Sequence, residues 1–353
     1  MPAKLNKIFA ALGLMLGYVT GSLKPDEYKV LFKYQVGSSQ VILIASLALF
    51  TAGPILSYFN YLIHGRFMVG GLVLFYLSVM YSQHPGFARF MPRISVSISL
   101  AVLSITWAIL FILGVWVWRI ILALWACLML ALFLESGIGS IPLFYPNTFT
   151  VVGLISLIEA SATGSLWPLL GFPLASLTSL MRRVEGRRRF SPLDIPYLAL
   201  PIMLLFDNDY SLIALIIAQL MAISTPLTIP KKAPLSAAYP IGASLGRFGL
   251  AVALALAIVG LGYVEVIHMV LIGFIATMMT SLCIPMLIPG YLWIWPRGYG
   301  VEVPVLVELS ALARIMYAYY GPWPLYISYA LLYAAMADIL MHYAMGERVL
   351  VQV

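Results

Sequence analysis

The sequence predicts an all-α protein, a polytopic bundle of about 12–13 transmembrane helices. The chain has 353 residues, of which 63% are hydrophobic and only 9% are charged, whereas a soluble domain carries roughly 25% charged residues. Its mean hydropathy is +1.01, and apolar runs of bilayer-spanning length alternate with short polar breaks. A soluble core could not bury so much apolar surface. We therefore expect one integral membrane domain over 1–353, divisible into halves 1–190 and 191–353.

The first half begins with an apolar stretch that we predict to be a retained helix, because no small-residue cleavage site of a signal peptide follows it. A charged connector at 24–33 leads to the next segment. His64, Gly65 and Arg66 mark a tight junction, and Gln83-His84-Pro85-Gly86 is typical of a turn. The expected segments are 5–22, 40–62, 66–82, two within 94–134 divided near 114–119, 147–161 and 165–181.

The second half opens at Asp194, and a polar break follows at 207–209. Pro285, Pro289 and Gly290 should end the helix that contains His268, because proline lacks the N–H that the next turn needs. Twelve spans result if one short pair is a single broken helix. The expected segments are 195–206, 210–226, 238–261, 266–288, 303–320 and 324–344.

The net charge of +7 comes from lysines and arginines at segment ends. They indicate topology, since Lys and Arg are enriched in short cytoplasmic loops, and they do not form the footprint of a nucleic-acid partner. If the basic run 182–189 faces the cytoplasm, alternation of the spanning segments places 24–33 and Arg348 on the cytoplasmic side as well. Glu265 then lies on the outer side. His64 and His268 then lie near the outer ends of their segments. We expect the cell membrane of a prokaryote, with the lipid bilayer as the first partner.

Two of the four histidines, His64 and His268, each precede a glycine by five or six residues in an apolar segment. An imidazole in hydrocarbon is costly without a partner, so each is a candidate functional residue. On facing helices the two would ligate one haem iron from both sides. Alternatively, one binds haem and the other a second metal, or each is hydrogen-bonded to a carbonyl. His84 and His342, near the inner ends, would suit a second haem, although a solvated loop and a helix end also explain them.

Intramembrane charges form the second group of candidates, because each is costly alone and should be paired. An arginine could hold a haem propionate, or the acids could form a proton path. Structural ion pairs are the favoured alternative, since such networks also form without function. These residues are Glu159, Arg247, Glu308, Arg314 and Asp338.

Three patches carry a family resemblance: IHGRFMVGG (63–71), IHMVLIGFIATMMTSLCIPMLIPG (267–290) and the closing helix pair (306–343) with its internal Arg314. They resemble the NnrS family of polytopic, haem- and copper-associated membrane proteins linked to nitric oxide metabolism. The resemblance implies a fold related to haem-copper oxidase subunits, with His64 and His268 as ligands. The family's further histidines are not evident here, so copper is the weaker expectation. Hydrophobic subunits of archaeal membrane b-type cytochrome complexes are broadly similar, which implies partner subunits of a redox complex.

Three functions remain open at this point. The first is haem binding in a respiratory or nitric-oxide-related electron-transfer system. The second is secondary transport, because the short segments at 147–161, 165–181 and 195–206 are typical of broken helices and Glu159 could couple protons. The third is a cofactor-free scaffold subunit of a larger complex. The sequence contains no Walker loop, dinucleotide fingerprint, HExxH or GxSxG motif, so it does not decide whether the chain is an enzyme.

Overall fold

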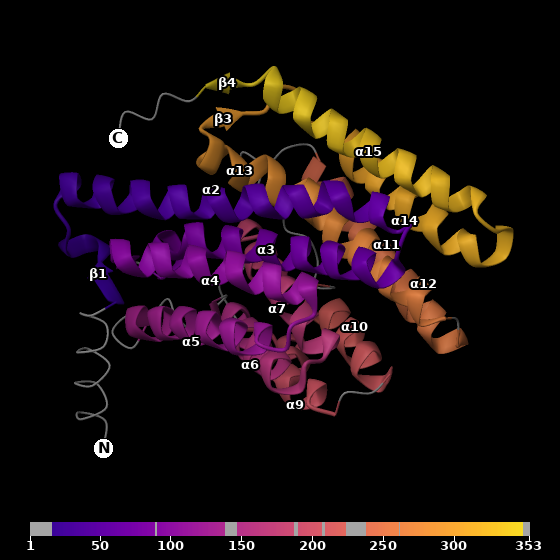
Figure 1. The fold of residues 1–353 in the computed structure, drawn as a ribbon, viewed down its shortest axis with the longest axis horizontal. Coiled ribbons are helices and arrows are strands. Elements are labelled where there is room, and N and C mark those ends of the chain that lie inside the picture. The colour runs from indigo at the N-terminus through magenta and orange to yellow at the C-terminus, as the bar shows by residue number, and fades with distance from the viewer. Residues whose placement is uncertain are drawn as a thin grey trace. The chain divides into compact units, whose positions relative to one another are not determined.

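The computed structural model describes residues 16–88, 90–137, 147–186, 190–206, 209–223, 238–260 and 262–348. These residues form two compact units, one ending at Ser179 and joined by 201–207, the other made of 180–200 and the chain from 208 onward. Each unit is a bundle of helices with little strand (Figure 1). The predicted all-α helical bundle is confirmed.

Unit 1 holds the N-terminal helices and one small strand pair. Strand β1 pairs antiparallel with β2, with Tyr18 opposite Met91. The elements are β1 (Gly17–Val19), the 3₁₀ turn η1 (Thr20–Ser22), α2 (Pro25–Leu56), α3 (Tyr61–Ala88), β2 (Phe90–Pro92), α4 (Ile94–Leu113), α5 (Trp118–Gly137), α6 (Asn147–Thr163), most of α7 (Leu166–Val184) and most of α9 (Leu200–Leu204).

Unit 2 holds the C-terminal helices, including one long helix with π-helical stretches. Its elements are the end of α7, η3 (Pro192–Asp194), α8 (Ile195–Leu198), α10 (Asp209–Ile223), α11 (Ala238–Val259), α12 (Tyr263–His268), the π-helices η4 (Met269–Ala276) and η5 (Met279–Cys283), α13 (Ile284–Leu292), β3 (Ile294–Trp295), α14 (Glu302–Tyr320), α15 (Trp323–Ala344) and β4 (Glu347–Arg348).

Six helices of the described chain are long and apolar enough to cross a membrane: α2, the α3 stretch Tyr61–Ser82, α4, α11, the continuous helix Tyr263–Leu292 and α15. Many large apolar side chains on them face outward, among them Ile44, Val102 and Ile258. Such apolar surface suits contact with lipid and would be an aggregation hazard in water. The chain is therefore a helical membrane protein.

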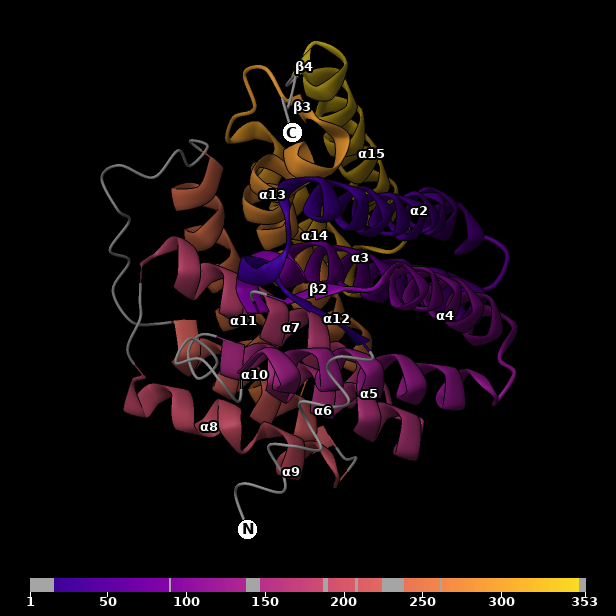
Figure 2. The same ribbon diagram turned by 90° about the vertical axis from the view of Figure 1, so that its left-hand side faces the viewer.

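The hairpin of α2 and α3 corrects three boundaries of the first half (Figure 2). The expected connector at 24–33 is the start of α2, because Pro25 at the first position and two acids in the first turn favour a helix N-terminus. The junction lies before His64: Asn60 Oδ1 accepts from the N–H groups of Leu62 and Ile63, at 2.9 and 3.2 Å, and so caps α3. The stretch 83–86 is helical backbone instead of a turn.

The predicted helix at 5–22 is wrong over its last residues, because Gly17–Val19 is extended and pairs with β2. Residues 1–15 lie outside the described chain. The division of the tract 94–134 is confirmed. Helix α4 ends at Gly114, whose φ of 69° is the left-handed conformation that glycine adopts at no steric cost.

The prolines at 285 and 289 do not end their helix, which runs on to Leu292. Pro285 lies in the first turn of α13, directly after a π-helical stretch, where a missing N–H costs least. Trp293, with a φ of 56°, ends the helix.

Candidate functional site

Polar side chains of unit 2 gather along the π-helical part of the helix Tyr263–Leu292. Thr277, Thr280 and Ser281 are buried there. In a π-helix each N–H pairs five residues back, which widens the turn, and such stretches are frequent at functional sites. Helix α11 lies against this region through glycines, since a Cβ at Gly249 would overlap the carbonyl oxygen of Gly273 and one at Gly242 would overlap Ser281. The backbones therefore approach closely beside the polar side chains.

Glu308 of α14 contacts this polar stretch and is only 3% exposed. Its Oε2 lies 3.1 Å from Thr277 Oγ1, and the same hydroxyl lies 3.1 Å from the carbonyl oxygen of Ile272. Within the described parts of the chain, Glu308 Oε1 has no hydrogen-bond partner. The predicted intramembrane acid Glu308 is thus buried beside a hydroxyl, and its hydrogen-bond partners among the described residues include no cation.

Tyr299 lies between this stretch and a cluster at the end of α15. Its hydroxyl donates to the carbonyl oxygen of Thr280 at 2.6 Å, and its ring centroid lies 5.5 Å from that of His342. Burial raises the pKa of the Tyr299 hydroxyl well above its usual range, and the neighbouring Tyr343, Asp338 and Glu302 raise it further. Tyr299 therefore keeps its proton and acts as a fixed donor.

The cluster itself consists of Glu302, Asp338 and His342. His342 Nε2 lies 3.1 Å from Glu302 Oε1 and 3.4 Å from Asp338 Oδ1, and each of the three residues offers a metal-ligand atom within 4.8 Å of the others. The ring's Nδ1 bonds to the carbonyl oxygen of Arg297 at 2.7 Å. Sequence reasoning named His342 and Asp338 separately but missed Glu302. The spacing of four residues within α15 was the available signal, because it places Asp338 and His342 on one face.

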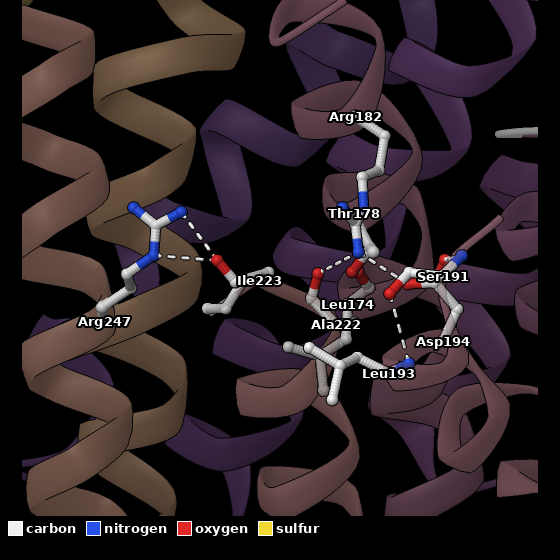
Figure 3. Close-up of polar contacts among 9 residues, drawn as sticks. All are labelled: Leu174, Thr178, Arg182, Ser191, Leu193, Asp194, Ala222, Ile223 and Arg247. Carbon is white, nitrogen blue, oxygen red and sulfur yellow. Dashed lines mark hydrogen bonds and ion pairs between the residues drawn. The ribbon is translucent and has the colours of Figure 1, made fainter. Parts of the chain in front are cut away.

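A second charged cluster binds the C-terminal end of α10 (Figure 3). Arg182 Nη2 donates to Asp194 Oδ1 at 2.6 Å and also to the carbonyl oxygen of Ala222. Arg247 donates to the carbonyl oxygen of Ile223 from Nε and Nη2, at 3.0 and 2.8 Å.

Glu185 completes the charge balance of this cluster. It accepts from the Tyr239 hydroxyl at 3.2 Å and lies 3.6 Å from Arg247 Nη2. Two arginines thus face two carboxylates, and the arginines also donate to helix-end carbonyls. Such a network has a structural role. It matches the alternative that Arg247 belongs to a structural ion pair. The sequence predicts a basic loop at 182–189, but Arg182 and Glu185 are buried in the structure.

The two histidines singled out from the sequence belong to different units, and each bonds to a main-chain carbonyl. His64 Nδ1 lies 2.9 Å from the carbonyl oxygen of Gly53, in the last turn of α2, and His268 Nδ1 lies 2.6 Å from that of Val264. A carbonyl only accepts, so Nδ1 carries the ring proton and the neutral ring has its lone pair on Nε2. The side chain of His84 lies outside the described residues.

Two further predicted charges stay within helices. The backbone carbonyl of Glu159, on α6, accepts from Thr163 Oγ1 at 2.9 Å, and Glu159 Oε2 is buried without a partner in the described chain. The Arg314 guanidinium lies 5.2 Å from the centre of the Tyr317 ring, a cation–π contact.

Comparison of the chain with protein-family models, with curated proteins and with solved structures finds no match. The function is therefore argued from the side chains of the chain itself.

Proposed function

We propose that the chain is a secondary transporter coupled to protons, with Glu308 as its proton-binding carboxyl. The observation that carries the proposal is the position of one hydroxyl, Thr277 Oγ1, within 3.1 Å of both Glu308 Oε2 and the carbonyl oxygen of Ile272.

A threonine hydroxyl has one proton and cannot serve two acceptors fully. If Glu308 were ionised, its Oε2 and the Ile272 carbonyl would compete for that proton, and a buried charge would lack a cation. A protonated carboxyl resolves both conflicts: its O–H donates to Thr277 Oγ1, and Thr277 donates to Ile272. The hydrogen-bond geometry therefore supports a neutral, protonated Glu308, because an unpaired buried carboxylate is very costly.

The surroundings suit a carboxyl that exchanges its proton. The π-helical stretches beside Glu308 shift backbone pairing by one residue, a feature typical of helices with functional roles. Thr277 contacts Glu308, the Thr277 carbonyl accepts from Thr280 Oγ1, and the Thr280 carbonyl accepts from the Tyr299 hydroxyl. The Tyr299 ring centroid lies 5.5 Å from that of His342, which contacts Glu302, a residue 45% exposed. Polar groups therefore lie at each step between the buried acid and the surface of the unit.

Transport is tested in proteoliposomes with an imposed pH gradient and a panel of radiolabelled amino acids, sugars, nucleosides and organic acids. We expect gradient-driven accumulation of at least one compound. Glu308→Gln should abolish accumulation but keep exchange of that compound at equal pH, because the amide carries no exchangeable acid proton. Ser104→Ala is the control, because this buried hydroxyl belongs to unit 1 and donates to the Leu100 carbonyl of its own helix. Accumulation that survives in Glu308→Gln would refute the role of Glu308.

A second candidate function is haem binding in an electron-transfer system. Both histidines bond to carbonyls, as the structural alternative expects, and their tautomers are also compatible with ligation. Carbonyls that hold Nδ1 leave Nε2 as the basic nitrogen, the arrangement that second-shell partners give to ligating histidines. In this proposal His268 ligates haem iron, Arg314 of the same unit binds a propionate, His64 holds a second metal in its own unit, and further redox subunits are partners. The isolated protein should then show a Soret band that is lost in His268→Ala. A colourless, metal-free protein would contradict it.

In both proposals the chain resides in a prokaryotic cell membrane with the run 182–189 on the cytoplasmic side, which the distribution of lysine and arginine supports.

A further inference from the structure

The end of the last helix pair brings together groups from three elements of unit 2. Glu302 is the first residue of α14, Asp338 and His342 lie in the last two turns of α15, and Arg297 follows strand β3. Arg297 and His342 bond twice, since the Arg297 N–H donates to the His342 carbonyl at 3.1 Å and His342 Nδ1–H donates to the Arg297 carbonyl at 2.7 Å. The imidazole is therefore fixed in position and in tautomer.

The fixed tautomer determines the protonation of the second ring nitrogen, Nε2. With Nδ1 protonated, the neutral ring presents a lone pair at Nε2. This nitrogen faces two carboxylate oxygens, Glu302 Oε1 at 3.1 Å and Asp338 Oδ1 at 3.4 Å. Three acceptors this close repel one another unless a cation lies among them. A proton on Nε2 would leave a net charge of −1 on the cluster, whereas a divalent metal ion would neutralise it.

We propose that Glu302, Asp338 and His342 bind a divalent transition-metal ion, with Zn²⁺ the best match. Zinc bonds to nitrogen and carboxylate oxygen at about 2.0–2.2 Å, so a tetrahedral site separates neighbouring ligand atoms by roughly 3.3–3.6 Å. The separations of 3.1 and 3.4 Å are close to this edge length. One imidazole with two carboxylates suits zinc and its neighbours better than Mg²⁺ or Ca²⁺, which prefer oxygen alone.

The surroundings of the three ligands fit a metal site. The Arg297 carbonyl holds Nδ1, and the Gly300 N–H donates to Glu302 Oε1 at 2.9 Å, so two of the three ligands are oriented by main-chain groups. Glu302 is 45% exposed, which gives the ion and one water ligand access from outside. A bound ion would tie the start of α14 to the end of α15.

The site is tested with zinc and cobalt on the full-length protein in detergent, stripped with a chelator. We expect one equivalent of Zn²⁺ to bind and raise the melting temperature, and Co²⁺ to give visible d–d bands that zinc displaces. His342→Gln and Asp338→Asn should each weaken binding by at least about 10–100-fold. Glu347→Gln, an exposed acid on the neighbouring strand β4, is the control that should bind normally. Testing both His342→Gln and Asp338→Asn keeps the experiment decisive if one of the two variants does not fold.

Two results would overturn the site. Equal zinc binding by wild type, His342→Gln and Asp338→Asn would place the ion on other histidines. A melting temperature that neither Zn²⁺ nor Co²⁺ changes would make the cluster a hydrogen-bonded group that holds no metal ion. Both readouts are independent of transport.

Discussion

Four arginines of the described chain contact the C-terminal ends of helices. Arg66 Nη1 donates to the Ile112 carbonyl at the end of α4 at 3.2 Å, and Arg182 and Arg247 donate to the last carbonyls of α10. Arg119 lies against Gly164, the residue that follows α6. The last four carbonyls of a helix lack an intrahelical donor, and lipid supplies no water to replace it. A guanidinium supplies several donors and a charge that complements the helix dipole.

Asp194 is the residue on which the cluster around α10 depends most. Asp194→Asn should lower the free energy of unfolding by about 3–5 kcal/mol, because it leaves the buried Arg182 guanidinium without its counter-ion. Thermal unfolding in detergent measures the loss. Glu347→Gln, on an exposed strand, should change stability by less than about 0.5 kcal/mol. A small effect of Asp194→Asn would show that the pair is not needed for stability.

The protonation of Glu308 has a stability signature that needs no substrate. Glu308→Gln should be nearly neutral, because an amide N–H can donate to Thr277 Oγ1 as the carboxyl O–H does. Glu308→Ala and Thr277→Val should each cost about 1–3 kcal/mol, since they remove a buried partner. If Glu308→Gln is as destabilising as Glu308→Ala in thermal unfolding, the carboxyl is ionised and our hydrogen assignment fails.

Because the pKa of Tyr299 is raised, we expect the protein to lose stability at alkaline pH. Its folded pKa is raised, so its contribution is complete below the unfolded pKa of about 10. It declines above that pH, because the unfolded chain releases the proton while the folded protein retains it. In Tyr299→Phe the melting temperature should be lower near pH 8, because the Thr280 carbonyl loses its donor, but it should fall less steeply above about pH 10. The exposed Tyr320→Phe should leave the slope unchanged.

At the scale of elements, the helix Tyr263–Leu292 combines features that oppose helical regularity. It contains two π-helical stretches, prolines at 285 and 289, and Gly273 pressed against α11. The π turns accommodate the close backbone contact and the hydrogen bond from Thr277 Oγ1 to the carbonyl five residues earlier.

The α2–α3 hairpin is held by three side-chain hydrogen bonds to main-chain carbonyls, each 2.7 Å long. Gln35 Nε2 donates to Tyr81, Ser46 Oγ donates to Gly71, and Ser78 Oγ donates to Ser39.

Glycine substitutions distinguish these packing requirements. Gly249→Ala should destabilise the protein by more than about 1 kcal/mol, because the new methyl group would overlap the Gly273 backbone. Gly290→Ala, also in a helix but with open space around it, should be neutral or stabilising by up to about 1 kcal/mol. Melting temperatures in one detergent compare the two. Equal effects would mean that α11 and the π-helix do not pack closely.

At the scale of the whole molecule, apolar outer surfaces and the distribution of charge define how the chain sits in a bilayer. Lys24 precedes α2, Lys29 and Lys33 lie in its first three turns, and Arg348 lies in β4. Both groups should face the cytoplasm, with the start of α12 on the other side.

Cysteine labelling in intact cells tests this topology. Lys24→Cys and Glu347→Cys should react with a membrane-impermeant maleimide only after lysis, whereas Tyr263→Cys should react before it. Cys127 and Cys283 are replaced by alanine in every variant of this test to remove background labelling. Labelling of Glu347→Cys in intact cells would invert the orientation of the C-terminal helices.

Much of the fold could be predicted because length and apolarity are local properties. The division at Gly114, the start at Asp194 and the closing helix pair all followed from the order of apolar runs and breakers. The predictions were wrong where local signals conflicted. Pro25, Asp26 and Glu27 indicated a polar connector, but they form the first turn of a helix. Pro285 indicated a helix end, but it lies in a first turn, where a helix tolerates proline.

The sequence by itself determined the membrane class and the candidate residues, since hydrophobic transfer and the cost of a buried charge depend on composition. Only the tertiary structure decided partners. It placed Glu308 beside Thr277, joined His342 to Glu302, and turned Arg247 into a helix cap. These three contacts join residues 24 to 40 positions apart. They depend on which helix faces meet, and a helix that is apolar on all sides does not specify those faces.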